Sequence, residues 1–85
     1  MELLRLDRCL EKSGYTTHTS IYNNIRNGLW TKPVRIGQRA VAWPDHEIDA
    51  ICVARTVGYS EAQIRELVDR LHAKRVDMLR NLEAI

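Results

Sequence analysis

Hydrophobic residues recur at helical spacing in the first third of the chain. Over residues 3–12 they stand three or four positions apart, which predicts a short amphipathic helix ended by Ser13-Gly14. The apolar positions of this helix are Leu3, Leu6, Cys9 and Leu10. A second helix of about ten residues follows, in which Ile21 and Ile25 lie one turn apart and Asn27-Gly28 forms the exit. Two short helices joined by a tight turn that contains glycine are typical of a helix-turn-helix.

The pattern changes to an alternating period after Gly28. Two runs of apolar and β-branched residues, 32–36 and 40–43, flank Gly37-Gln38-Arg39, and this arrangement predicts a β-hairpin. Pro33 is compatible with the hairpin, because proline is tolerated at a sheet edge or at the start of a strand. We call residues 32–43 the wing.

Two further helices are predicted in the second half of the chain. Pro44 precedes a third helix over residues 45–56, whose acidic first turn complements the positive end of the helix dipole. The inner stripe of this helix consists of Ile48, Ile51 and Cys52. Ser60 and Gln63 then match a capping box, and the fourth helix runs for about 24 residues, or roughly 36 Å.

The predicted fold class is mainly α with a small β-hairpin: a winged helix-turn-helix followed by a long C-terminal helix. We expect a winged domain over residues 1–57 and a C-terminal helical element over residues 58–85. The long helix is expected to project, and a second copy of the chain is expected to cover its apolar side. The predicted contact residues are Ile64, Leu67, Leu71, Met78 and Leu82. The alternative is that this helix folds back onto the core of its own domain.

Length and charge favour a binding protein over an enzyme. A chain of 85 residues is one small domain and leaves little room for an enclosed catalytic cavity. The net charge is only +2, but it is unevenly distributed. Residues 1–44 hold seven basic and three acidic residues, whereas residues 45–85 hold six basic and eight acidic residues. The two halves therefore carry +4 and −2. A polyanion would bind to the basic first half.

An ordered series of short motifs spans residues 13–51. It comprises Ser20-Ile21-Tyr22, Gly28-Leu29, the run from Lys32 to Gly37, Arg39-Ala40-Val41, Trp43-Pro44 and the acidic helix start at residues 45–49. The series resembles the AlpA family of phage-type transcriptional regulators, which are small winged helix-turn-helix proteins related in fold to phage excisionases and to the DNA-binding heads of MerR regulators. This resemblance implies a protein that binds duplex DNA.

The second helix is the element expected to enter the major groove. A helix in this position needs polar and basic side chains on its outer face, and Ile21 and Ile25 leave that face free by pointing inward. The predicted DNA contacts of this helix are Thr17, His18, Thr19, Tyr22, Asn23 and Arg26. We expect His18, Asn23 and Arg26 to make the main contacts and the threonines to reach phosphates. Members of the family often have a basic residue at the position of Asn23. Asparagine can still make two hydrogen bonds to adenine.

The wing has the same polarity as the outer face of the second helix. No acid occurs between Gly28 and Trp43, so we expect the wing to lie along the phosphate backbone or to enter the minor groove. Its predicted DNA contacts are Lys32, Arg35, Gln38 and Arg39. Trp30 and Trp43 each adjoin a helix boundary and are expected to pack in the core.

The sequence indicates no catalytic or metal site. His18, His46 and His72 fall on three different predicted elements, and neither a glycine-rich phosphate loop nor a paired-carboxylate motif occurs. Cys9 and Cys52 lie among apolar residues and are expected to be reduced core side chains. We therefore expect no enzyme activity, no cofactor and no metal. No apolar run approaches the ~20 residues that span a bilayer, so we expect a cytoplasmic, nucleoid-associated protein without membrane contact.

Three functions are compatible with these features. The first is a sequence-specific transcriptional regulator of a prophage or similar mobile element, with duplex DNA and further copies of itself as partners. The second is an excisionase-like protein that bends attachment-site DNA for an integrase. The third, from a different class, is an adapter that binds other proteins through its C-terminal helix.

Overall fold

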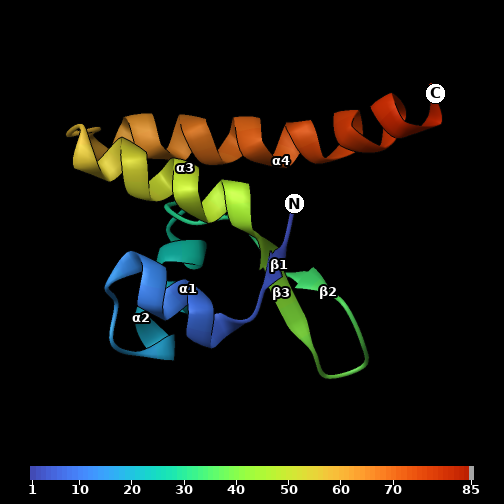
Figure 1. The fold of residues 1–85 in the computed structure, drawn as a ribbon. Helices are drawn as coiled ribbons and strands as arrows, with labels where there is room; N and C mark the ends of the chain where they lie inside the picture. Colours follow the sequence, from blue (N-terminus) through green and yellow to red (C-terminus); the bar gives the residue numbers. More distant parts are fainter. Residues whose placement is uncertain (85) are drawn as a thin grey trace.

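Residues 1–84 are described by the computed structural model, which contains four helices and a three-stranded sheet (Figure 1). The helices are α1 (Leu6–Ser13), α2 (His18–Arg26), α3 (Asp45–Thr56) and α4 (Glu61–Glu83). The strands are β1 (Leu3–Leu4), β2 (Val34–Arg35) and β3 (Val41–Pro44), in the spatial order β1-β3-β2. The predicted fold class, mainly α with a small β-hairpin and a long C-terminal helix, is confirmed.

The N-terminal strand β1 corrects the prediction of a helix over residues 3–12. Leu3 and Leu4 pair antiparallel with the end of β3, and helix α1 starts only at Leu6. Burial alternates as in a strand, since Leu4 is 2% exposed and Leu3 is 43% exposed. Strand pairing therefore removes Leu3 from the apolar helical stripe in which we expected it.

The ends of α1 and α2 follow the sequence pattern. Gly14 after α1 and Gly28 after α2 have left-handed backbone angles, with φ of +81° and +77°, which other residues adopt only with strain. Thr17 caps α2, because its hydroxyl accepts a hydrogen bond from the Ser20 N–H at 3.2 Å. The predicted exit of each helix at a glycine is confirmed.

The wing consists of β2 and β3, as predicted, joined by a turn at residues 37–39. Val34 lies opposite Ala42, and Arg35 lies opposite Val41. β3 is the central strand of the sheet, because β1 pairs with its other edge. The same strand runs directly into α3, whose predicted bounds are confirmed.

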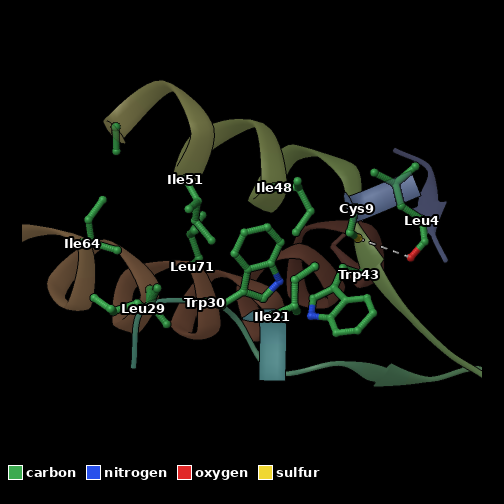
Figure 2. Close-up of a cluster of buried hydrophobic side chains, with 12 residues drawn as sticks. Leu4, Cys9, Ile21, Leu29, Trp30, Trp43, Ile48, Ile51, Ile64 and Leu71 are labelled. Carbon is green, nitrogen blue, oxygen red and sulfur yellow. Dashed lines mark hydrogen bonds between the residues drawn. The ribbon is translucent and has the colours of Figure 1, made fainter. Parts of the chain in front are cut away.

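Two tryptophans lie at the centre of the hydrophobic core (Figure 2). Trp30 and Trp43 are almost fully buried, and the Trp43 indole N–H donates to the Thr31 carbonyl at 2.8 Å. Both tryptophans therefore pack, as predicted. The two cysteines are free; Cys9 is buried in this core, and burial raises the pKa of its thiol to about 11. Cys52 is only partly buried, at the edge of the core.

The first half of α4 packs against the rest of the chain, and the second half extends beyond it (Figure 1). Ile64, Val68 and Leu71 are buried in the core of their own chain. Two of the predicted self-association residues, Ile64 and Leu71, are therefore already covered, as the alternative of a folded-back helix expects. Within residues 1–84, no helix is long and apolar enough to cross a membrane.

A buried carboxylate explains why a basic residue, Arg75, lies between the apolar residues Leu71 and Met78 of α4. Glu47 of α3 is 0% exposed, and Arg75 of α4 donates to both of its carboxylate oxygens, at 2.7 and 2.6 Å. The same guanidinium donates to the Lys32 carbonyl at 2.8 Å. The Lys32 N–H in turn donates to Nε2 of His72 at 3.0 Å. These bonds tie α4 to α3 and to the base of the wing.

A second tether joins α4 to the end of α2. The guanidinium of Arg65 donates from Nε to the Asn27 carbonyl at 2.9 Å. A cation that bonds a carbonyl at a helix C-terminus satisfies a free acceptor and complements the dipole. α4 is thus bonded to the exit of α2, to the wing base and to α3.

We predict that Arg75→Met destabilises the fold by about 3 kcal/mol, because it leaves the Glu47 carboxylate buried without its partner. The free energy of unfolding, from urea titration, measures this loss. Arg80→Met, on an exposed part of α4, is the matched control and should change the free energy by less than about 0.5 kcal/mol. The double variant Glu47→Met/Arg75→Met should regain most of the loss; if it is as unstable as Arg75→Met alone, the prediction is wrong.

We also predict that His72 makes the fold less stable in acid. Burial, followed by the charge of Arg75, lowers the pKa of His72 from its ordinary value of 6.5. The unfolded chain then binds more protons, so the stabilising contribution is complete above pH 6.5 and is lost as the pH falls through the folded-state pKa. Urea midpoints measured at about pH 7.5 and about pH 5 should therefore differ less in His72→Gln, which keeps an acceptor for the Lys32 N–H. Equal losses in the two proteins would contradict this role.

Candidate nucleic-acid interface

Two elements with exposed polar side chains lie on the side of the molecule away from α4. Figure 1 shows α4 along one edge of the molecule, with α2 and the tip of the wing toward the opposite edge. α2 is fixed there by Ile21, which is fully buried, and by Ile25, which packs at the margin of the core. This face therefore presents a helix and a hairpin together.

All six predicted DNA-contacting residues of α2 and its cap are exposed. They are Thr17, His18, Thr19, Tyr22, Asn23 and Arg26. Thr17 has a structural role as well, because its hydroxyl caps the helix and lies 2.8 Å from the Ser20 hydroxyl. The rings of Tyr22 and Trp43 pack in a T-shaped arrangement, with centroids 6.5 Å apart, and Tyr22 is still 41% exposed. Within residues 1–84, the side chains of Asn23 and Arg26 make no such contact and are exposed to a ligand.

The four predicted contacts of the wing are exposed but do not form one cluster. Gln38 and Arg39 lie in the turn at the tip. Arg35 donates from Nη2 to the Gln38 carbonyl at 2.8 Å, so it braces this turn. Lys32 lies at the opposite end of the wing, where its backbone is bonded to His72 and Arg75 of α4. The tip is therefore the part of the wing that shares the exposed face with α2.

A shallow groove joins the start of α2 to the wing. It is lined by Arg5, Leu6, Asp7, His18, Arg39 and Val41. The groove brings together two predicted contacts from different elements, His18 and Arg39. Within it, Nε2 of His18 lies 3.5 Å from a carboxylate oxygen of Asp7.

Arg5 is a candidate ligand-binding residue that the sequence did not reveal. A helix over residues 3–12 would have placed it in a regular first turn, whereas it lies between β1 and α1 at the edge of the groove. Its backbone caps α1, and its side chain makes no capping hydrogen bond. The signal that could have located it is the strand pairing of Leu3 and Leu4, which depends on residues about 40 positions away.

Comparison with known proteins identifies one family. The model of the family described as prophage CP4-57 regulatory protein (AlpA) matches residues 2–50, more than half of the chain. This match runs from β1 into α3, so it includes α2 and the whole wing and leaves α4 outside. No curated protein and no solved structure matches the chain.

Proposed function

The chain belongs to the AlpA family of prophage regulatory proteins, and on that premise we propose that it is a sequence-specific DNA-binding transcriptional regulator of a prophage or similar mobile element. It acts by occupying DNA and performs no chemistry of its own. The observation that carries this proposal is the shared exposed face of α2 and the wing tip, opposite α4.

The dimensions of α2 suit the major groove. An α-helix with its side chains is about 10–12 Å across, which fits a groove about 12 Å wide, and the 9 residues of α2 extend about 13 Å along its axis. Asn23 and Arg26 lie exposed along this helix, and both side chain types bond base edges: asparagine bonds adenine and arginine bonds guanine. Sequence reading is therefore proposed for α2.

The tip of the wing is proposed to contact the phosphate backbone of the DNA or to enter the minor groove. Arg39 supplies the positive charge that attracts a phosphate. The hydrogen bond from Arg35 to the Gln38 carbonyl fixes the conformation of the turn in the absence of DNA. Backbone contacts fix the register of a protein on DNA and carry no sequence information directly. The wing thus supplies affinity and orientation.

We further propose that the chain associates with itself through the overhanging half of α4. Met78, Leu79 and Leu82 line one apolar hollow there, together with Met1. Leu82 is 69% exposed. Of the contacts expected from the sequence, Leu67, Met78 and Leu82 keep surface that a second copy can cover. Two linked copies would bind two half-sites and gain affinity from that linkage.

We predict that affinity for a duplex selected from random sequences falls steeply with salt, and that Arg39→Ala lowers the slope of log affinity against log salt by about one unit. Fluorescence anisotropy over a salt series measures both. Arg70→Ala removes an exposed arginine from α4, on the far side from α2, and should leave the slope unchanged. A protein that binds no duplex at low salt refutes the proposed function.

We predict that Met78→Glu/Leu82→Glu abolishes self-association, because burying a carboxylate in an apolar contact costs more than the contact returns. Mass in solution, by sedimentation equilibrium, reports the change. Val76→Glu is the matched control, since Val76 is exposed on another side of α4 and does not line the hollow. A wild-type chain that is monomeric at all concentrations refutes this part of the proposal.

A further inference from the structure

We propose that the groove between α1, α2 and β3 is a binding site for one backbone phosphate of the duplex, with Arg5 and Arg39 as its cations and Asp7 as an opposing charge. This inference rests on the proposed DNA-binding function. It adds a third element, the start of α1, to the helix and the wing. It also assigns roles to two residues, Arg5 and Asp7, that have none in the proposal above.

The position of the groove is the first argument. It lies between His18, at the start of α2, and Arg39, at the tip of the wing. The sugar-phosphate backbone separates the major groove of DNA from the minor groove. A protein that places a helix in one groove and a hairpin in the next must take a strand of that backbone between them. The hollow between α2 and the wing is where this strand would pass.

The pairing state of the arginines is the second argument. Arg8, Arg65, Arg75 and Arg80 each have a carboxylate partner in their own chain. Among residues 1–84, six arginines form no ion pair, namely Arg5, Arg26, Arg35, Arg39, Arg55 and Arg70, and of these only Arg5 and Arg39 line the groove. A guanidinium without a carboxylate partner keeps its full capacity to bind a phosphate with two parallel hydrogen bonds.

Asp7 is the third argument, because its charge sets how strongly the groove attracts an anion. Its side chain is 88% exposed and lies 3.5 Å from Nε2 of His18. A phosphate that enters the groove meets this carboxylate at close range and competes with it for His18. Asp7 also stands in the first turn of α1, where an acid stabilises the helix. The acid therefore stabilises α1 while it weakens phosphate binding.

The test is a binding series on the duplex selected by the wild-type protein. Arg5→Ala should weaken binding about tenfold and lower the salt slope by about one unit, as expected for one lost phosphate contact. Arg8→Ala is the matched control, because Arg8 is an exposed arginine of α1 that pairs with Glu11 and does not line the groove. Asp7→Asn should tighten binding about fivefold, because it removes one like charge near the phosphate.

A modified duplex locates the contact. Single neutral methylphosphonates are placed in turn along the strand between the helix and wing contacts. At one position the substitution should weaken the wild-type protein about tenfold and weaken Arg5→Ala clearly less, since that variant has already lost one of the two cations at this phosphate. Arg5→Lys should restore part of the affinity and the sensitivity to that one position. Circular dichroism of each variant shows that α1 is retained.

The outcomes separate this inference from the function on which it rests. If the wild-type protein binds no duplex at low salt, the proposed function itself fails. If the wild-type protein binds and Arg39→Ala weakens it, but Arg5→Ala behaves like Arg8→Ala, the function stands and the phosphate site is wrong. Weaker binding by Asp7→Asn would also overturn the opposing role of that acid.

Discussion

The register of α4 on the rest of the fold is set by one buried charge. Glu47 has no access to water, and an isolated carboxylate in that position would cost several kcal/mol, so the chain must deliver a cation to it. Arg75 comes from α4, 28 residues away, and its two bonds fix how α4 lies on α3. With α4 in this position, Ile64, Val68 and Leu71 pack into the hydrophobic core. Because Arg75 and His72 also hold the backbone of Lys32, the same arrangement positions the base of the wing. The C-terminal helix is therefore a structural part of the winged body.

Much of the fold was predictable because its signals are local. Glycines at positions 14 and 28 end two helices, the capping box at Ser60 starts another, and alternating residues around Gly37 form the wing. The errors concern long-range partners. A strand of two residues such as β1 has no periodicity of its own and exists only because β3 pairs with it. The apolar residues of α4 likewise look alike in sequence, and only the fold separates the buried Ile64 and Leu71 from the exposed Leu82.

The candidate site divides in the same way. Exposure of the polar face of α2 follows from its helical period, and every residue predicted there is exposed. The distribution of partners among the cations could not be predicted, because it depends on distances between elements. Arg75 and Arg65 are bonded to the body, Arg35 braces its own turn, and Arg39 remains available. Arginines thus serve stability on the side of α4, and on the side of α2 they are proposed to serve recognition.

The direct passage of β3 into α3 affects the entropy cost of binding a partner through the hairpin. Pro44 ends the strand and precedes the first residue of the helix, and β1 holds the other edge of the same strand. With no flexible linker between the hairpin and the core, most of the conformational entropy of the hairpin stem has already been lost during folding. Binding of a partner to the hairpin then needs little further ordering of the protein backbone. More of the free energy of the contacts therefore contributes to affinity.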